Sequence, residues 1–516
     1  MTNELHLKSG HKMFPELPMK RSFAATLLPG LILALVPSLS AATPQWPQFR
    51  GPNGSGLATD DKPGPVSFGP ERNVLWKTAL PPGYSSPCIW GDHIFLTAIH
   101  EGGKSLETLC LNRKDGSILW RTAAPPMEFE KSLHPFSNAA SSTPATDGNR
   151  VYVYFGAYGT VAYNFAGKEV WNRPLPTPPT QYGTSSSPIV TGGLVILQRD
   201  GSSTNSQVLA LDSKTGRTRW TAERPLNRES FSTPMVWNHN GIADLVTVGN
   251  GRLDAYDPHD GKERWWTPGM TMQPIGVAVA GNGLLFASAT GTGSSSEPLD
   301  TPDWEGLLKR FDRNGDGRIS KDEVPEDAAI QLRKEVPKET PGNMLSYQMM
   351  FFVFFDTNQD GVFTKEEWTG ALQFLKSNAN NVMAIRAGGR GNISTTHIAW
   401  KADRGLSEMP SPLYYRDRLY FVRDGGVLTS YAPETGKVVI DRERLGALGQ
   451  YVASPVAAGG RIYAASVQGK MVILQAGDTL KVLAVNDLKE AITSTPAILE
   501  GKLYVRTANH LIAFGE

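Results

Sequence analysis

The chain has 516 residues, long enough for one large core or several small ones, and its 40% hydrophobic content indicates a globular protein. Its 51 basic and 50 acidic side chains leave a formal net charge of +1. This balance offers no electrostatic footprint for nucleic acid or a membrane surface, so neither is expected as a partner. The 52 glycines and 37 prolines suit many short strands joined by tight turns.

Residues 1–42 have the pattern of an export signal peptide. A Lys-Arg pair precedes an apolar run from Phe23 to Val36, and small residues suited to cleavage follow. The pattern fits best if translation starts at Met19. Because the apolar run is short for a membrane span, which needs about 20 residues, we expect an exported protein, periplasmic or extracellular, without stable membrane insertion. A short N-terminal anchor is the alternative.

A Ser/Thr/Gln-Pro step followed by a β-rich run recurs along the chain. Its eight prolines are spaced 57, 44, 46, 40, 138, 43 and 41 residues apart, at Pro87, Pro144, Pro188, Pro234, Pro274, Pro412, Pro455 and Pro496. A period of roughly 40–50 residues is typical of repeat architectures. Each unit reads as four short strands with Gly turns, and four-stranded sheets repeated around an axis form a β-propeller.

The first and last strands are expected to close the ring. The final unit, residues 493–516, supplies three strands, and an unmatched strand, NVLWKTAL at 73–80, precedes the first Ser-Pro step. Pairing the two removes exposed sheet edges and places Trp76 beside the C-terminal segment. We therefore predict an all-β, eight-bladed β-propeller over residues 73–291 and 381–516.

The repeat resembles the pyrroloquinoline-quinone-like propeller family in its secreted, multi-blade branch. The resemblance covers nearly all of the chain after residue 42 except the long fifth interval, and it is carried by WPQFRGPNGSG (46–56), ASSTPATDGNRVYVYFGAYG, ALDSKTGRTRW, AYDPHDGKERW and PSPLYYRDRLYFVRDGGVLTSYAPETGK. The family implies the propeller fold. It includes both the non-catalytic propeller of outer-membrane protein assembly and quinone-dependent alcohol dehydrogenases, so it does not decide the function. Residues 43–72 are expected to form an irregular cap.

The long interval contains two twelve-residue EF-hand loops within residues 292–380, which predicts an inserted α-helical EF-hand pair. Calcium prefers six to eight oxygen ligands, and the Glu at position 12 supplies two of them. We therefore expect two Ca²⁺ sites. Their ligands are Asp312, Asn314, Asp316, the Arg318 carbonyl, Ser320 and Glu323 in the first loop, and Asp356, Asn358, Asp360, the Val362 carbonyl, Thr364 and Glu367 in the second.

The segment MLSYQMMFFVFF, residues 344–355, is rich in Met and aromatic side chains. Calcium sensors expose such compositions to bind targets. We prefer the interpretation that these side chains pack inside the pair or against the propeller, so that calcium acts as a constitutive clip. A calcium-switched interaction protein is the alternative.

The chain has two cysteines, Cys88 and Cys110, placed on the first and third strands of one blade. Strands two apart are separated by roughly 9.6 Å, whereas a disulfide needs Cα atoms within about 7 Å. We predict two buried free thiols. Quinone-dependent dehydrogenases of similar fold carry adjacent cysteines and often a Cys-x-x-Cys-His haem motif, so these departures argue against a bound pyrroloquinoline quinone.

Candidates for a site at the ring mouth are few. His134, Asn138 and Tyr182 precede strand starts, and such positions line one mouth of a propeller, although most polar residues there cap turns. Arg390 and His397 read as a turn residue and a strand hydrogen-bonding residue. We predict a monomeric, non-catalytic binding or scaffold module that engages a protein, peptide or glycan at the mouth or at a blade edge. The competing hypothesis is a quinone-dependent oxidoreductase.

Overall fold

The computed structural model describes residues 43–100, 105–129, 134–201, 206–224, 229–290, 302–331, 338–339, 344–377 and 380–516. The predicted export signal, residues 1–42, lies outside the described residues. Residues 43–516 form one compact unit. Within the described ranges, none of the helices combines the length and the hydropathy that a membrane crossing requires.

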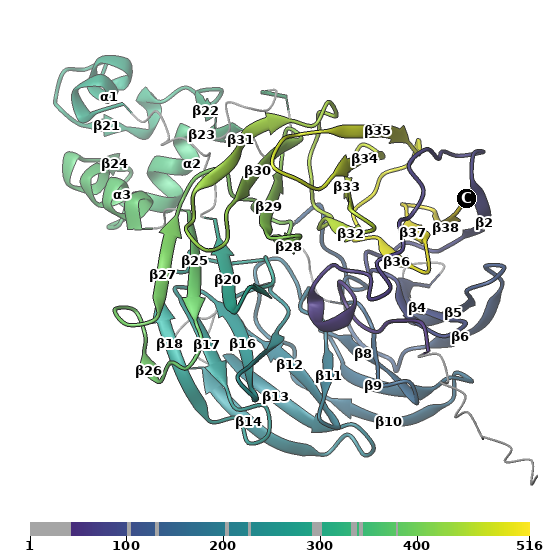
Figure 1. Ribbon diagram of the computed structural model, residues 1–516. Coiled ribbons are helices and arrows are strands. Elements are labelled where there is room, and N and C mark those ends of the chain that lie inside the picture. The colour runs from purple at the N-terminus through teal and green to yellow at the C-terminus, as the bar shows by residue number, and fades with distance from the viewer. Residues whose placement is uncertain are drawn as a thin grey trace, which may run out of the picture. The chain divides into compact units, whose positions relative to one another are not determined.

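Eight antiparallel sheets are arranged around a common axis as the blades of a propeller, which confirms the predicted fold (Figure 1). Blade 1 consists of β3 (Cys88–Trp90), β4 (His93–Ile99), β5 (Leu106–Asn112) and β6 (Ile118–Ala123). Blade 2 consists of β7 (Ala145–Thr146), β8 (Arg150–Phe155), β9 (Gly159–Asn164) and β10 (Glu169–Pro174). Blade 3 consists of β11 (Ile189–Thr191), β12 (Leu194–Arg199), β13 (Ser206–Asp212) and β14 (Thr218–Arg224). Blade 4 consists of β15 (Met235–His239), β16 (Ile242–Gly249), β17 (Arg252–Tyr256) and β18 (Glu263–Pro268).

The second half of the ring repeats this plan. Blade 5 consists of β19 (Val279–Gly281), β20 (Leu284–Ala289), β25 (Asn381–Arg386) and β27 (Ile398–Ala402). Blade 6 consists of β28 (Leu413–Tyr415), β29 (Arg418–Arg423), β30 (Val427–Tyr431) and β31 (Val438–Arg444). Blade 7 consists of β32 (Val456–Ala458), β33 (Arg461–Ala465), β34 (Lys470–Gln475) and β35 (Val482–Asp487). Blade 8 consists of β36 (Ala497–Leu499), β37 (Lys502–Arg506), β38 (His510–Phe514) and β2 (Val74–Ala79). A short β26 (Gly391–Asn392), from the turn of blade 5, adds in parallel to β18 of blade 4.

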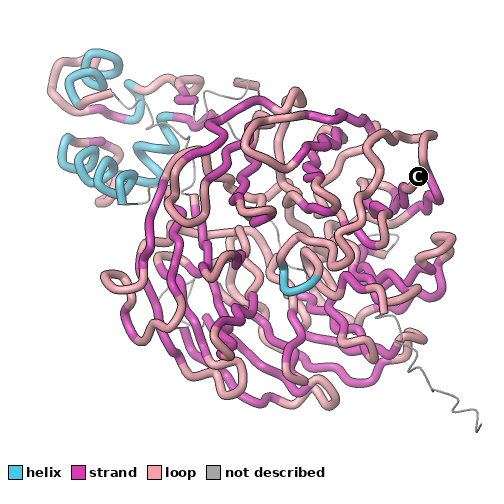
Figure 2. The backbone as a smooth tube through the Cα atoms, in the orientation of Figure 1, coloured by secondary structure: helices cyan, strands magenta, loops and turns pink. Residues whose placement is uncertain are grey.

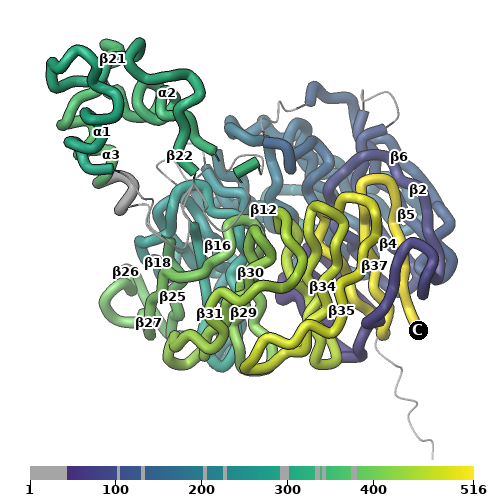
Figure 3. The backbone as a smooth tube through the Cα atoms, turned by 90° about the horizontal axis from the view of Figure 1, so that it is seen from above, coloured from purple at the N-terminus to yellow at the C-terminus, as the bar shows by residue number. Residues whose placement is uncertain are grey.

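Blade 8 joins the two ends of the propeller, as predicted. The N-terminal strand β2 pairs antiparallel with β38, with Trp76 opposite Ala513. In Figures 1 and 3 the purple start of the described chain accordingly runs beside the yellow C-terminal strands. The ring therefore has no open edge between its first and last blades.

In blades 8, 1, 2, 3 and 5, a tryptophan of the outer strand packs against the next blade. The Trp76 indole N–H donates to the Arg113 carbonyl at 3.0 Å, and its ring covers Gly116 so closely that a Cβ there would lie 2.4 Å from it. Gly116 also has φ +73°, a backbone conformation that residues with a side chain rarely adopt. Both the ring contact and the backbone conformation therefore exclude a side chain at this position. The same ring-on-glycine contact recurs in Trp120–Gly167, Trp171–Gly216, Trp220–Gly261 and Trp400–Gly436.

The segment before the first blade, which the sequence suggested as an irregular cap, contains two short elements. It forms β1 (Gln45–Trp46), which pairs with β3 of blade 1, and the single turn η1 (Pro52–Gly54). Asn53 exchanges two hydrogen bonds with the backbone of blade 4, and Arg50 donates to the Pro412 carbonyl of blade 6. Figure 1 shows this purple turn at the centre of the ring. The segment 43–58 therefore closes one end of the central channel.

The helical insert lies between β20 and β25, which are neighbours in the sheet of blade 5. Its elements are α1 (Trp304–Phe311), β21 (Ile319–Ser320), η2 (Lys321–Glu323), β22 (Ala329–Gln331), β23 (Met344–Ser346), α2 (Tyr347–Met349), η3 (Met350–Phe355), β24 (Val362–Phe363) and α3 (Lys365–Ser377). Apart from η1, the described helices all belong to this insert (Figure 2). Its core is aromatic, with the rings of Phe351 and Phe363 stacked at 4.4 Å.

Cys88 and Cys110 are buried free thiols, as predicted. Both pair in register with Phe95 on the strand between them, one on each side. Burial raises the pKa of the Cys110 thiol to about 12, so it stays protonated.

Candidate functional site

The open end of the channel is lined by the Ser or Thr that precedes the proline in seven of the eight repeats. In six of these seven residues the backbone N–H donates to the hydroxyl of the equivalent residue in the next blade, at 2.9–3.0 Å. The donor-to-acceptor steps run Ser86 to Thr143, Thr143 to Ser187, Ser187 to Thr233, Ser411 to Ser454, Ser454 to Thr495, and Thr495 back to Ser86.

Blade 5 corrects one part of the sequence interpretation. The pattern had placed its repeat position at Pro274, but the residue whose N–H donates to Ser411 Oγ, at 3.0 Å, is Val277. The repeat position is therefore Val277-Ala278, four residues past Pro274, without a proline. Because Val277 has no hydroxyl, the step from blade 4 to blade 5 lacks the bond made at the other steps. The nearby pair Gln273-Pro274 resembles the repeated step before proline in composition, but it does not occupy the corresponding position in the blade.

A second layer of side chains lies two residues before each position of this ring. Alternate residues of an extended chain face the same side, so this layer shares the channel with the hydroxyl ring. It consists of Tyr84, Ser141, Ser185, Phe231, Ile275, Met409, Val452 and Thr493. Together the two layers enclose a cavity of about 220 Å³. Phe49, from the segment that closes the other end, contributes to its lining.

The mouth of this cavity carries an arc of aromatic side chains from blades 2 to 4. The rings of His134 and Phe136 lie 5.5 Å apart, those of His134 and Tyr182 meet edge-on at 5.6 Å, and those of Tyr182 and Phe231 lie 5.9 Å apart. Tyr84 adds a fifth ring and donates its hydroxyl to the Pro135 carbonyl at 3.3 Å. The arc presents several ring faces and edges to one small volume.

Carboxylates lie on and behind the rim. Glu408 lines the cavity from blade 6. Glu229 is buried and accepts from the Gln181 backbone N–H at 2.7 Å and from Gln273 Nε2 at 2.9 Å. Burial, and then the charges of Glu229 and Glu408, raise the pKa of Tyr182. Burial lowers the pKa of His134, which favours its neutral form.

The structure brings together two of the residues that the sequence suggested for the mouth. His134 and Tyr182 are in contact and both line the cavity. Asn138 caps a turn instead, with its side-chain oxygen accepting from the Ala140 N–H at 2.8 Å. Arg390 donates to the neighbouring Gly389 carbonyl, and His397 contacts Thr396, so both serve the turn of blade 5.

Sequence reasoning missed Phe136, Phe231 and Glu408. The position two residues before the ring residue was a usable signal for Phe231, because that position faces the channel in every blade. Glu408 is one residue further from the step, and Phe136 lies in the longer loop before blade 2. Neither position has an equivalent in every repeat.

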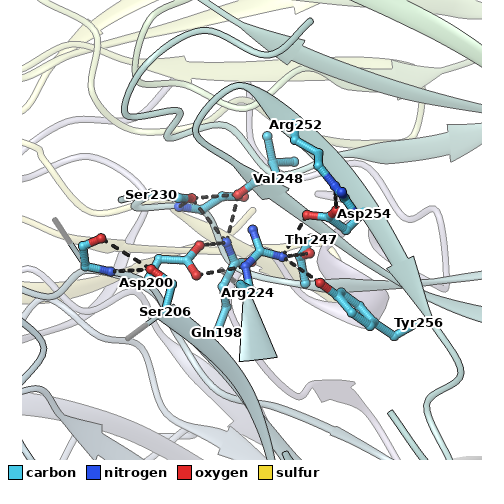
Figure 4. A network of polar contacts seen from close by, with 12 residues as sticks. Gln198, Asp200, Ser206, Arg224, Ser230, Thr247, Val248, Arg252, Asp254 and Tyr256 are labelled. Atoms are coloured by element: carbon cyan, nitrogen blue, oxygen red, sulfur yellow. Dashed lines mark hydrogen bonds and ion pairs between the residues drawn. The ribbon is translucent and has the colours of Figure 1, made fainter. Parts of the chain in front are cut away.

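A buried ionic cluster joins blades 3 and 4 beside the channel (Figure 4). Arg224, at the end of β14, contacts Asp200 at 2.9 Å and Asp254 of β17 at 3.1 Å. Gln198 Nε2 donates to Asp200 and to the Val248 carbonyl, both at 2.7 Å. Burial raises the pKa of Asp200 to about 6 in spite of Arg224. The cluster therefore pairs its buried charges across the boundary between blades 3 and 4.

Both EF-hand loops have the fold that calcium loops require. β21 and β24 pair through Ile319 and Phe363, the position 8 residues, and so join the loops back to back. Gly317 and Gly361 have φ +78° and +77°, which allows the sharp turn at position 6. The position 12 residue Glu323 accepts the Arg313 and Ser320 N–H groups at 2.9 and 2.8 Å.

The predicted ligands occupy their loop positions and offer hard oxygen donors. Asp312 accepts from Gly315 and Gly317, and Asn314 from Asp316. In the second loop the buried Asp356 uses one carboxylate oxygen for the Gly361 N–H, while Oδ1 has no partner in the described structure. Within the described ranges, no three His, Cys, Asp or Glu side chains converge as a metal centre. The donor set nevertheless fits calcium, and the orphaned Asp356 oxygen is a suitable ligand.

Comparison with known proteins places this architecture in a family. A family model described as outer membrane protein assembly factor BamB matches residues 105–293 and 365–515, more than half of the chain. The chain belongs to this family. An EF-hand family model matches residues 305–324 and 351–370, which contain both predicted loops. A stretch of 84 residues is 33% identical to polcalcin Nic t 2 of Nicotiana tabacum, and it covers 16% of this chain and 84% of that protein.

Solved structures similar to this BamB-family chain include a BamB, a designed protein and an alcohol dehydrogenase. BamB from Moraxella catarrhalis aligns with TM-score 0.48 at 12% identity, over 85% of this chain and 98% of that one. The computationally designed Ika8 protein aligns with TM-score 0.51 at 8% identity, over 86% and 99%. Quinohemoprotein alcohol dehydrogenase from Comamonas testosteroni aligns with TM-score 0.49 at 11% identity, over 91% and 80%. At such identities the likeness concerns the fold alone.

The chemistry of the cavity can be compared with the needs of a quinone cofactor. Pyrroloquinoline quinone is a planar polycarboxylate, so a site for it calls for cationic donors. Of the described residues that line the cavity, none is Lys or Arg, and Glu408 adds a carboxylate. These residues do not fit the cofactor.

Proposed function

We propose that this BamB-family chain is an exported, calcium-binding, non-catalytic propeller that binds a segment of a protein partner in the mouth of its channel. The observation that carries the proposal is the cavity of about 220 Å³, closed at the bottom by residues 43–58 and rimmed by aromatic side chains. Aromatic residues are enriched at protein interfaces because a large apolar surface combines with few rotatable bonds. A cavity of this size suits one side chain and its flanking backbone.

A random peptide library displayed on phage tests the proposal. Peptides enriched on the wild-type protein are re-measured on Ser185→Trp, which fills the second layer of the cavity, and on Arg217→Trp, an exposed turn residue of blade 3. We expect at least about tenfold weaker binding to Ser185→Trp and unchanged binding to Arg217→Trp, because filling the cavity costs more than one anchor contact. Equal binding to both variants would place the interaction elsewhere.

The calcium part of the proposal is supported by the two intact loops and their pairing through β21 and β24. The paired loops hold the aromatic core of the insert between them, so bound calcium would stabilise that fold. On this view calcium acts as a structural clip.

One observation favours calcium-switched binding as a second candidate function. Met349, Val353 and Phe354 are 46%, 70% and 58% exposed. Exposed apolar side chains of this kind bind partners or hydrophobic dyes. Dye fluorescence measured with calcium and with a chelator distinguishes the two views: a strong increase with calcium supports the switch, and equal signals support the clip.

A further inference from the structure

The hydroxyl ring at the floor of the cavity has seven O–H groups without a protein acceptor. Each hydroxyl oxygen already accepts one backbone N–H, which fixes its position around the axis. Among the residues that the structure describes, none accepts a hydrogen bond from these hydroxyls in return. The seven residues are 1–5% exposed and all line the cavity: Ser86, Thr143, Ser187, Thr233, Ser411, Ser454 and Thr495. Their O–H groups therefore need an acceptor that enters the cavity.

Blade 5 has Val277 at the ring position, but it supplies a hydroxyl from another place. Thr290 directly follows β20, is 8% exposed and lines the cavity. Its Oγ1 atom is buried and has no hydrogen-bond partner in the described structure, neither a donor nor an acceptor. Every blade therefore contributes at least one hydroxyl to the lining of the cavity, and the Thr290 hydroxyl is entirely available to a ligand.

A positive charge without a counter-ion lies behind the ring at blade 6. The Arg50 guanidinium is fully buried, and its Nη2 donates at 2.8 Å to the carbonyl of Pro412, the residue that follows Ser411 of the ring. Its Nε and Nη1 atoms have no partner in the described structure. Burial lowers the pKa of Arg50 to about 9, so the side chain still carries its charge at neutral pH. This charge favours acceptor groups at the floor and disfavours a second cation there.

The floor therefore combines hydrogen-bond donors with a positive charge behind them. A ligand group that displaces water from the hydroxyls binds well only if it replaces the hydrogen bonds of that water. An apolar group leaves buried hydroxyls unsatisfied, which costs about 1–3 kcal/mol for each of them. A Lys or Arg head has donors but no acceptor, and the Arg50 charge opposes it. A carbonyl or carboxylate oxygen, which offers lone pairs and no proton, is the complementary group.

We propose that the cavity takes up, from the bound segment of its protein partner, a side chain that ends in a carbonyl or carboxylate oxygen, and that this oxygen accepts from the ring hydroxyls and from Thr290. This inference rests on the proposed function, because it names the chemistry of the segment that enters the mouth. The apolar stem of such a side chain suits the aromatic arc. The ring is held in place by its backbone N–H donors, so little ordering of the protein is needed on binding.

Isothermal titration with designed peptides tests the inference. The probes are acetyl-Gly-Gly-Gln-Gly-Gly-amide and the same peptide with glutamate, norleucine or lysine in place of glutamine. We expect the glutamine peptide to bind about tenfold more tightly than the norleucine peptide, which leaves the hydroxyls unpaired, and the lysine peptide to bind weakest. The glutamate peptide distinguishes the two sources of the oxygen: tighter binding than glutamine assigns a carboxylate, and weaker binding assigns an amide.

Matched variants assign the effect to the floor of the cavity. Thr290→Val removes a hydroxyl that has no partner in the described structure and keeps the shape of the side chain, so folding should be unaffected. Thr221→Val, at an exposed threonine of β14, is the control. We expect the preference for glutamine over norleucine to fall about threefold or more in Thr290→Val and to stay unchanged in Thr221→Val. In Arg50→Met, which removes the buried charge, the discrimination against lysine should also fall.

Failure of this inference is distinguishable from failure of the proposed function. If the norleucine or lysine peptide binds as tightly as the glutamine and glutamate peptides, or if Thr290→Val keeps the full preference, the selection of oxygen acceptors is wrong. Absence of binding by all four peptides would also overturn it. The proposed function stands or falls separately, on whether library peptides of any composition lose binding in Ser185→Trp.

Discussion

Trp76 of β2 is paired in register with Ala513 of β38, so a residue near the start of the described chain completes the blade that contains its end. The same indole donates to the Arg113 carbonyl of blade 1. One side chain thus takes part in both joints that close the ring, the one within blade 8 and the one between blade 8 and blade 1.

Replacing Trp76 tests this closure. Trp76 is 8% exposed, whereas its neighbour Leu75 is 46% exposed on the same strand. We expect Trp76→Ala to lower the free energy of unfolding by about 3–5 kcal/mol, because it opens a cavity at both joints. Leu75→Ala should cost less than about 1 kcal/mol. Chemical denaturation measures both, and similar losses in the two variants would contradict the assigned role.

A methyl group at Gly116 should separate steric exclusion from backbone strain. Gly116 and Gly192 both have positive φ, +73° and +54°, but a Cβ at Gly116 would meet the Trp76 ring at 2.4 Å and one at Gly192 would meet no atom within 4 Å. Gly192→Ala should therefore show only the strain, about 1 kcal/mol. Gly116→Ala should lower the free energy of unfolding by a further ~1–3 kcal/mol, because the added methyl group overpacks the contact with the Trp76 ring. Equal destabilisation of the two variants would rule out the tight ring contact.

The buried side chain of Arg506 also ties blade 8 to blade 1. Its guanidinium donates to the Ser85 and Thr97 carbonyls, at 3.1 and 2.9 Å, to Ser85 Oγ at 2.7 Å and to the Pro81 carbonyl at 3.3 Å. Burial lowers the pKa of Arg506 to about 9, so desolvation offsets part of this gain. Arg506→Met removes the side-chain donor from the Ser85 and Pro81 carbonyls, whereas Ser85 Oγ and the Thr97 carbonyl keep their bonds to Thr97 N–H and Ser85 Oγ. We expect a net loss of about 3 kcal/mol in the free energy of unfolding.

Arg217→Met, at an exposed turn, is the matched control for this substitution. It should change stability by less than about 0.5 kcal/mol. Thermal and chemical denaturation of both variants give the comparison, and a stable Arg506→Met protein would show that desolvation outweighs the hydrogen bonds.

Acid stability should depend on Glu490, which contacts Lys77, Thr507 and His510 of blade 8. Burial raises its pKa, but hydrogen bonds from His510, Thr507 and Lys77 outweigh burial and lower the pKa of Glu490 to about 2, from an ordinary value of 4.5. A carboxyl whose pKa is depressed in the folded state stabilises the protein above its unfolded pKa. The contribution of Glu490 is therefore complete above pH 4.5 and is lost as the pH falls from 4.5 toward 2.

Denaturation measured across this pH range checks the Glu490 prediction. The difference in unfolding free energy between the wild type and Glu490→Gln should be constant above about pH 5 and should become smaller below that pH. Glu71→Gln, at an exposed carboxylate, should follow the wild-type profile. A pH-independent difference would exclude the ionised form of Glu490 as the stabilising species.

Calcium should bind at two sites and stabilise the protein. Calorimetric titration should give a stoichiometry of two for the wild type and of one for Glu323→Gln, which removes the position 12 carboxylate of the first loop. Glu326→Gln, just outside the loop, should keep both sites. At calcium one hundred times above Kd, each site should add about 2.7 kcal/mol. Unchanged melting temperatures with calcium and with a chelator would refute binding.

The sequence alone was sufficient for the features that repeat or that lie within one short segment. The eight units follow from a periodic Pro and Trp pattern, because every blade solves the same packing problem with the same residues. The partner of β2 was predictable because the final unit lacked one strand. The twelve-residue EF-hand loops carry all their ligands within a few turns of chain, so spacing alone identifies them.

Only the tertiary structure determined the mouth of the channel. Tyr182, Phe231 and Glu408 lie far apart in the sequence, and they approach one another because blades 3, 4 and 6 face a common axis. The register of blade 5 likewise required the bond between Val277 and Ser411, since the nearby Pro274 imitates the repeat. Local patterns report how each blade pairs with itself, whereas a site on the axis forms only when separate blades converge.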